Sequence, residues 1–184
     1  MVSPTDYDLV RAIAQGDTQA LETLYTRYGV RLLAYLVGQL EDRLLAEEVL
    51  QDVMLAVWQG AGRFRGDSAV STWLLAIARR RAISARQRHT PNHVPLGDML
   101  RSSEANPLET VARQAEYHEI RAAMQTLPAE QRETLELIFY HGLSGPEAAK
   151  VLGVAPGTIK SRLHRAKTLL HRVLRLRKET SNAQ

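Results

Sequence analysis

The residues best suited to chemistry in this chain are cations gathered near its C-terminal end. Between Ala155 and Lys178 the sequence carries eight lysines and arginines and no acidic residue. Lysine and arginine neutralise phosphates, and serine and arginine also hydrogen-bond the edges of bases. This pattern indicates contact with a nucleic acid, although a solvated amphipathic helix would have the same composition. The predicted elements that position these side chains distinguish nucleic-acid contact from a solvated helix.

Two short helices joined by a tight turn are predicted where the basic run begins. Ser144 can cap a helix that reaches about Leu152, and Glu147, three residues after the cap, completes a capping box. Gly153 supplies a left-handed stop, and Pro156 stands where the first turn of a second helix would begin. Such a pair is a helix-turn-helix, whose second helix enters the major groove of DNA. This context favours DNA contact over simple solvation.

The second helix of the pair has an apolar face and a polar face. With a helical period of 3.6 residues, one stripe gathers Ile159, Leu163, Ala166, Leu170 and Val173. The residues that point away from this stripe or flank it are Thr158, Lys160, Ser161, Arg162, His164, Arg165 and Arg172. We predict that this polar face binds DNA.

A second basic segment, from Arg79 to Arg88, ends a helix that is predicted to begin at Ser71 or Thr72. Its inward side chains are expected to be Val70, Trp73, Leu74 and Ile77. The opposite face is expected to carry Arg79, Ala82 and Arg86, with Arg80 and Arg81 toward its edges. Because the segment contains no acid, its electrostatic field is strongly positive.

The helix predicted from Asp42 to Gln59 has a mixed outer face. Its inner stripe is formed by Ala46, Val49, Leu50, Val53 and Val57. The opposite face presents Leu44, Glu47, Glu48, Gln51 and Leu55. Two leucines among carboxylates are unusual on a purely solvated surface, because they leave apolar area in water. They either pack on another element of the same domain or dock a partner protein.

Composition excludes several classes of protein. The chain has 184 residues, a formal net charge of +4 and an isoelectric point near 9.6, and it contains no cysteine. Disulfides and thiolate metal sites are therefore excluded. No stretch approaches the roughly eighteen apolar residues of a membrane span, and the first residues lack the basic start and apolar run of a signal peptide. We expect a cytoplasmic protein without direct membrane insertion.

Motifs of catalysis are missing from the sequence. It contains no Walker loop, no Gly-x-Ser-x-Gly elbow and no His-Glu-x-x-His zinc motif. His89 and His93 are four residues apart, but no third ligand lies near them and no helical pattern joins them. We expect no enzymatic activity, no cofactor and no metal.

The fold is predicted to be all-α, in two small helical domains. Apolar residues follow a 3.6-residue period almost throughout, and alternating strand patterns are absent. Prolines, glycines and serines between residues 90 and 107 break this period and indicate a flexible linker. The first domain is expected over residues 1–89 and the second over residues 108–184.

Within these domains the caps and breakers predict further elements. Thr5 followed by Asp8 is a capping-box-like start for one helix, and Asp17 is expected to cap the next. On that second helix the side chain of Tyr25 is expected on a buried face. In the second domain one helix is predicted over residues 110–126 and another over 129–141. Ile120 and Phe139 are expected to pack against the core of that domain.

Three motifs in this order resemble sigma factors of the sigma-70 family, in the short extracytoplasmic-function class. The segment Ala46–Trp58 (AEEVLQDVMLAVW) is similar to region 2.2, and Phe64–Ala78 (FRGDSAVSTWLLAIA) is similar to regions 2.3 and 2.4. The segments Leu127–Arg132 (LPAEQR) and Gly157–Ala166 (GTIKSRLHRA) are similar to region 4. The resemblance covers nearly the whole chain and implies a promoter-specificity subunit of RNA polymerase.

The resemblance also implies roles for residues. The resemblance implies that Glu48, Gln51 and Asp52 contact the β′ clamp helices of core polymerase, together with Leu55 of the outer face. Recognition and melting of the −10 element fall to Phe64, Asp67, Ser68, Arg79, Arg80 and Arg86. The −35 element is read by Thr158, Lys160, Ser161, Arg162, His164 and Arg165, and the second domain also binds the β flap. Most members of this class are held inactive by an anti-sigma factor, so the resemblance implies such a partner, with self-inhibition through the linker as the alternative.

One departure from the family pattern concerns Arg80. Relatives often carry asparagine at this position, which suits a base edge, whereas arginine prefers phosphate or guanine. The −10 preference of relatives therefore does not transfer directly to this chain.

Two rival functions follow from the same residues. A stand-alone helix-turn-helix regulator would explain Leu143 to Leu174 equally well, but it gives no reason for the outer faces of the first domain. A protein-interaction module that does not bind DNA would predict binding that is insensitive to salt.

Overall fold

The computed structural model describes residues 4–89, residue 120 and residues 122–181, with side chains described as far as 175. Every regular element in these ranges is helical, and they divide into two units that are treated separately. The predicted all-α fold in two helical parts is thereby confirmed. The linker predicted over residues 90–107 lies outside the described residues, as does most of the helix predicted over 110–126.

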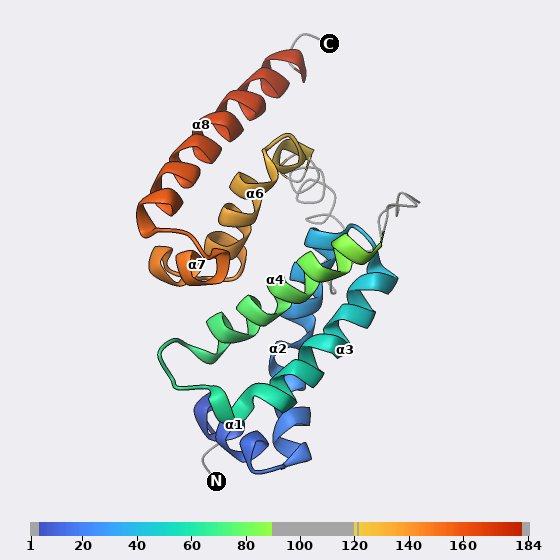
Figure 1. Cartoon of the computed structure of the whole chain (residues 1–184). Helices are drawn as coiled ribbons and strands as arrows, with labels where there is room; N and C mark the ends of the chain where they lie inside the picture. The colour runs from blue at the N-terminus through green and yellow to red at the C-terminus, as the bar shows by residue number, and fades with distance from the viewer. Residues whose placement is uncertain (1–3, 90–119, 121, 182–184) are drawn as a thin grey trace, which may run out of the picture. The chain divides into compact units, whose positions relative to one another are not determined.

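Four helices and one short turn of 3₁₀ helix build the first unit (Figure 1). They are α1 (Asp6–Ala14), α2 (Thr18–Leu40), α3 (Arg43–Gly60), η1 (Ala61–Arg63) and α4 (Val70–Arg88). The predicted caps at Thr5 and Asp17 are confirmed, because each side chain accepts hydrogen bonds from backbone N–H groups of the first turn that follows. The side chain of Asp42 caps α3 in the same way. Thr5 and Asp8 form the predicted capping box.

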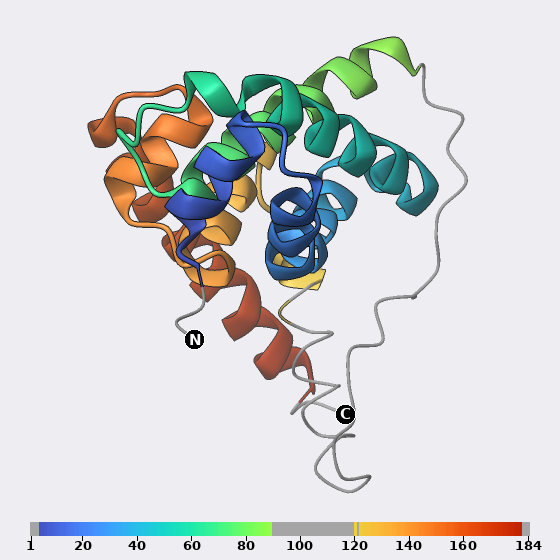
Figure 2. The same cartoon turned by 90° about the horizontal axis from the view of Figure 1, so that it is seen from below.

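The helices α2, α3 and α4 lie side by side, as Figures 1 and 2 show from two directions, and α1 packs against α2, α3 and η1. All five residues of the predicted inner stripe of α3 are buried. Leu24, Leu36 and Leu74 complete the core from α2 and α4. Burial of these apolar side chains is what joins the four helices into one unit.

The prediction that Tyr25 is buried is wrong, because 49% of its surface is exposed. Its ring lies along its own helix, where a Cβ atom on Gly29 would come within 3.3 Å of it. The missing side chain of Gly29 thus gives the ring a place on the outside of α2.

The prediction for α4 needs two corrections. The helix begins one residue earlier than predicted, at Val70, and Ala82 is buried instead of outward. The burial of Ala82 follows from the packing of α4 against α2 and against α3, which buries the helix on two sides. The solvent strip that remains is centred on Arg80 and Ser84.

The second unit consists of α6 (Ala129–Leu135), a π-helical turn η2 (Glu136–Tyr140), α7 (Gly145–Leu152) and α8 (Pro156–Ser181). The helix α6 packs along α8. Leu127, Leu135 and Ala166 form a buried cluster, against which Met124, Leu163 and Leu169 pack. This cluster joins the long basic helix to the elements before it.

The predicted helix over residues 129–141 ends in a wider turn than expected. The π-helical hydrogen bonds of η2 place an extra residue in the turn, which shifts the face that each later side chain occupies. Leu137 is fully buried, whereas Phe139 is 63% exposed, so the prediction that Phe139 packs is wrong. Ile120 is also exposed, because no described element covers it.

None of the described helices is both long enough and apolar enough to cross a membrane.

Candidate nucleic-acid and polymerase interfaces

The helix-turn-helix is built as the sequence predicts. Ser144 and Glu147 form a reciprocal capping box, in which the backbone N–H of Ser144 donates to Glu147 Oε2 at 2.9 Å. The Ser144 hydroxyl donates to the same carboxylate oxygen at 2.6 Å. Gly153 ends α7 with φ of +67°, a left-handed conformation that favours glycine. The turn therefore brings α8 back at a fixed angle to α7.

Four of the predicted −35 residues lie together on the outer face of α8. Lys160, Ser161, His164 and Arg165 are all exposed, and their spacing of one, three and one residues places them on one face. Thr158 is half-buried, and its backbone carbonyl accepts a hydrogen bond from the Ser161 hydroxyl at 3.0 Å. This face offers donors of both kinds that DNA requires, cations for phosphates and a hydroxyl and a guanidinium for bases.

The sixth predicted −35 residue, Arg162, lies apart from this outer face. Its guanidinium forms an ion pair with Glu130 of α6 at 2.6 Å, and only 17% of its side chain is exposed. The contact joins α8 to the start of α6 across 32 positions of the sequence. Arg162 therefore braces the recognition helix within its unit.

The outer face of α3 is free of other described elements. Leu44 is 77% exposed and Leu55 is 54% exposed, with Glu48 and Gln51 exposed between them. Of the two alternatives for these leucines, packing within the described part of the domain is therefore excluded. Apolar side chains exposed among polar ones in this way are typical of a protein interface.

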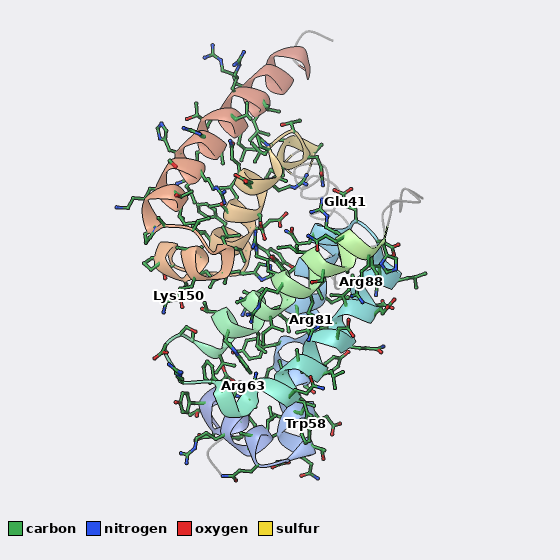
Figure 3. The ribbon with its side chains drawn as sticks, in the orientation of Figure 1. Glu41, Trp58, Arg63, Arg81, Arg88 and Lys150 are labelled. Carbon is green, nitrogen blue, oxygen red and sulfur yellow. The ribbon has the colours of Figure 1, made fainter. Side chains whose placement is uncertain are left out.

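Asp52, the remaining residue predicted to bind polymerase, lies at the edge of this face. It is half-buried, and its carboxylate is 3.8 Å from the guanidinium of Arg88, which Figure 3 labels near the end of α4. The pair is largely solvated, so its contribution to stability is small. It places the basic end of α4 next to the outer face of α3.

The arginines of α4 differ in exposure. Arg80 and Arg86 are exposed, whereas Arg79 and Arg81 are half-buried; Figure 3 labels Arg81 on the middle of the helix. Arg80 stands on the solvent strip that α2 and α3 leave open. Among the arginines predicted to meet the −10 element, Arg80 and Arg86 are therefore the two that the helix presents to solvent.

The loop of residues 64–69 connects η1 to α4 and carries the other predicted −10 residues. Asp67 is exposed and Ser68 is half-buried. The ring of Phe64 has two aromatic neighbours: its centroid is 4.8 Å from that of Trp73 and 5.7 Å from that of Tyr7, and both pairs are tilted. Aromatic faces that line a loop in this way are suited to stack with an unpaired base.

Sequence reasoning missed Tyr7 as a neighbour of this loop. Its hydroxyl donates a long hydrogen bond of 3.5 Å to the carbonyl of Arg65, which is 58 positions further along the chain. The capping box at Thr5 predicts the helix that carries Tyr7, but no periodicity within α1 indicates the loop as its contact.

The position of α1 is fixed by polar contacts to α2. The Tyr28 hydroxyl donates to the Asp6 carboxylate, and the Arg27 guanidinium forms an ion pair with the same carboxylate at 2.7 Å. Partial burial, followed by the hydrogen bond to Asp6, raises the pKa of Tyr28 to about 12. The neutral phenol is therefore the form that holds α1 in place.

A metal site is not formed by the described residues. No group of three histidine, aspartate or glutamate side chains among them is arranged to hold an ion. His93, one of the two histidines considered above, lies outside the described ranges.

Comparison with known protein families gives two matches. The profile described as "Sigma-70 region 2" matches residues 24–91, and the profile described as "Sigma-70, region 4" matches residues 117–170. The first contains α3, the 64–69 loop and α4, and the second contains the helix-turn-helix. All three candidate interfaces, the outer face of α3, the 64–69 loop with α4 and the outer face of α8, thus fall inside matched segments.

Individual relatives match both units at once. The ECF RNA polymerase sigma factor SigM of Mycobacterium tuberculosis is 35% identical over 175 residues, which cover 92% of this chain and 85% of the relative. The ECF RNA polymerase sigma factor SigX of Bacillus subtilis is 30% identical over 168 residues, which cover 88% and 87% of the two chains.

Solved structures agree on the fold. CnrH, solved in complex with the cytosolic domain of CnrY, aligns with a TM-score of 0.69 and 24% identity, covering 93% of this chain and 97% of that one. The sigma factor RpoE of Bartonella quintana, solved in complex with the anti-sigma factor NepR, aligns with a TM-score of 0.61 and 24% identity. The alignment with RpoE covers 84% of this chain and 96% of that one.

Proposed function

The chain belongs to the extracytoplasmic-function group of the sigma-70 family, and from that premise we propose how its residues divide the work of promoter recognition. A sigma factor makes no RNA: core RNA polymerase does so, and the sigma factor places it at a promoter. The stand-alone regulator considered above is set aside, because the relatives match both units of this chain. The residue roles below are our assignment.

Core polymerase binds the outer face of α3. The observation that carries this assignment is the exposure of Leu44 and Leu55 beside Glu48 and Gln51, within the same unit as the arginines of α4. The leucines contribute apolar contact area, and the polar residues around them fix the orientation of the partner. This division is usual at protein interfaces. We assign this contact to the β′ clamp helices, with Asp52 at its edge.

The −10 element is opened and read by the 64–69 loop and α4. Extruding a base from the duplex costs a few kcal/mol, so the receiving site must return stacking and hydrogen bonds. Phe64 supplies a ring, and Asp67 and Ser68 supply polar groups in the same loop. Arg80 and Arg86 meet the backbone of the DNA or a guanine, and Arg79 supports them.

The −35 element is read by α8. Lys160, Ser161, His164 and Arg165 form the contacting face, and Thr158 and Arg162 hold that face in position. The −10 part spans residues 1–89 and the −35 part residues 108–184, with residues 90–107 between them. The second part also binds the β flap of polymerase.

Further partners follow from the same assignment. We place the protein in the cytoplasm with its polymerase and promoter DNA. An anti-sigma factor covers it when it is inactive, which is supported by the complex with the anti-sigma factor NepR in which its structural neighbour RpoE was solved.

The test is whether the full chain assembles with core RNA polymerase. Size-exclusion chromatography of the mixture should give co-elution, and run-off transcription from a cognate promoter should then require the added chain. Absence of a complex, with transcription unchanged, would remove the proposed function.

A matched pair of variants locates the contact. Gln51→Ala with Leu55→Ala should weaken core binding by roughly tenfold or more, since an apolar anchor at an interface carries 1–2 kcal/mol or more. Gln19→Ala with Val30→Ala removes a similar pair of exposed side chains from α2 and should leave core binding unchanged. Equal affinities of the two variants for core would show that the outer face of α3 is not the contact.

A further inference from the structure

Tyr7 connects α1 to the 64–69 loop by two kinds of contact. Its ring lies 5.7 Å from the Phe64 ring at an interplanar angle of 53°, and its hydroxyl donates to the Arg65 carbonyl at 3.5 Å. Phe64 in turn lies 4.8 Å from Trp73 at the start of α4. The three rings are thus linked by two tilted contacts, and Tyr7 is exposed over 45% of its surface.

Gly66 shows how closely Tyr7 approaches the backbone of the loop. A Cβ atom built on Gly66 would lie 2.6 Å from both the hydroxyl oxygen and Cε2 of Tyr7. Gly66 also has φ of +77°, where side chains of L residues are strained. The tyrosine therefore covers the loop at the point where its chain direction changes.

Tyr7 is itself held from behind. Asp6 beside it bonds Tyr28 and Arg27 of α2, and Arg27 also donates to the Pro4 carbonyl at 2.9 Å. Leu9, Val10 and Ile13 are buried on the inner side of α1. The helix α1 is thus a fixed support, and its exposed aromatic residue is directed at the loop.

We propose that Tyr7 is a positioning residue for the −10 element, which holds the 64–69 loop in the conformation that receives an unpaired base. The inference rests on the proposed function of that loop. Tyr7 lies outside the residues 24–91 that the region 2 profile matches, so it extends the −10 site to α1. Fixing the loop before DNA arrives reduces the ordering cost on binding, which raises affinity and base discrimination together.

The test uses holoenzyme reconstituted from core polymerase and full-length variants. Tyr7→Ala should lower the fraction of promoter opened at −10, measured by permanganate reactivity of thymines, by about three- to tenfold, the range that one aromatic pair can carry. Tyr7→Ala should also reduce the difference in opened fraction between a matched promoter and promoters with single base changes in the −10 element. Affinity for core and for −35 duplex should not change.

Two further variants separate positioning from general stability. Tyr7→Phe keeps the ring and should retain most of the activity, because the hydroxyl bond is long. Tyr25→Ala removes another half-exposed tyrosine from the same unit and should open promoters as the wild type does.

A double-mutant comparison tests the contact itself. Gly66→Ala should impair opening strongly in the wild type and less in the Tyr7→Ala background, because the collision is relieved while the backbone strain remains. Additive effects of the two changes would overturn the proposal.

Other outcomes are equally decisive. Opening by Tyr7→Ala at the level of Tyr25→Ala would overturn the inference, as would a parallel loss of core affinity, which would make Tyr7 a structural residue only. Failure of the wild-type holoenzyme to open any promoter would instead remove the proposed function and this inference with it.

Discussion

Arg162 and Arg165 stand three positions apart on one basic helix, yet their surroundings differ. The guanidinium of Arg162 is largely buried against Glu130, whereas Arg165 is exposed beside Ser161 and Lys160. An arginine already paired within the protein has to break that pair before it can bind DNA. Removal of Arg165 should therefore weaken DNA binding, whereas removal of Arg162 should lower the stability of the second unit.

If the Arg165 guanidinium forms a bidentate hydrogen bond with a guanine, Arg165→Ala should weaken −35 binding by about 1–3 kcal/mol. It should also relax base preference at one or two positions. Equal loss on every −35 sequence would show a phosphate contact instead. The measurement is the affinity of holoenzyme for a set of −35 variants. Circular dichroism melting of the free variant should match the wild type.

Arg162→Ala should lower the stability of the second unit, because it leaves Glu130 without its partner on α8. Since Glu130 is largely exposed, we expect a loss of about 1 kcal/mol. Urea unfolding of Arg162→Ala, of Glu130→Ala and of the double variant measures the coupling between the two side chains. Full additivity would show that the ion pair does not brace the helix.

Tyr28 provides a prediction about pH. Its pKa is raised from 10.0 to about 12 in the folded chain, so the neutral phenol is bound more favourably in the folded than in the unfolded state. The stability that it contributes is complete below pH 10 and is lost as the pH rises through 12.

The corresponding experiment compares wild type with Tyr28→Phe by denaturant unfolding across this range. The wild type should be more stable near neutral pH by about 1 kcal/mol, the size of one partly solvated hydrogen bond. The difference should shrink between pH 10 and 12. A difference that stays constant with pH would mean that Tyr28 does not donate to Asp6.

At the scale of elements, the turn between α7 and α8 decides whether the recognition helix is presented at the correct angle. Gly153 has φ of +67° and nothing within 4 Å of the place of a side chain, so a substitution there meets backbone strain and no collision. Gly157 lies in the first turn of α8 with equal space around it and without a positive φ. The two glycines form a natural matched pair.

Gly153→Ala should destabilise the second unit by about 1 kcal/mol, the cost of a left-handed conformation. Gly157→Ala should stabilise it by about 0.5–1 kcal/mol, because alanine favours the helix and restricts the unfolded chain. Hydrogen exchange of the amides in α7 and α8 of the free protein measures the change in stability that each substitution causes. Changes of the same sign at the two positions would contradict the assigned turn.

The elements that the sequence could predict are those defined by local signals. Caps at Thr5, Asp17, Asp42 and Ser144 mark helix starts because one side chain satisfies backbone donors next to it. The inner stripe of α3 is correct at every position because one face of that helix meets the core. The helix-turn-helix combines both kinds of signal.

The predictions that failed depend on contacts between elements. Ala82 is small enough for either side of α4, and its burial follows from two neighbouring helices that local periodicity does not specify. Phe139 is exposed because the π-helical turn η2 shifts the helical face, and a 3.6-residue period cannot anticipate that shift. Tyr7 reaches a loop 58 positions away, so its contact required the fold.

The whole molecule carries two basic faces, so the salt dependence of its promoter binding tests their role. Its basic faces belong to two units of one chain, and the salt dependence of promoter binding sums the phosphate contacts of both. Contacts to roughly six phosphates should cost on the order of a thousandfold in affinity between about 50 and 200 mM salt. A flat titration of holoenzyme on promoter DNA would exclude DNA binding by these faces and would support a protein-interaction module.

We propose that this single chain binds a promoter at two elements, −35 and −10. Selection of bound sequences from random DNA with reconstituted holoenzyme tests it most directly. We expect two different sequence blocks at a fixed separation, with permanganate-reactive thymines in the downstream block. Arg165→Ala should change only the upstream block, and Tyr7→Ala only the downstream one. A single block, or an inverted repeat read by a dimer, would contradict the account.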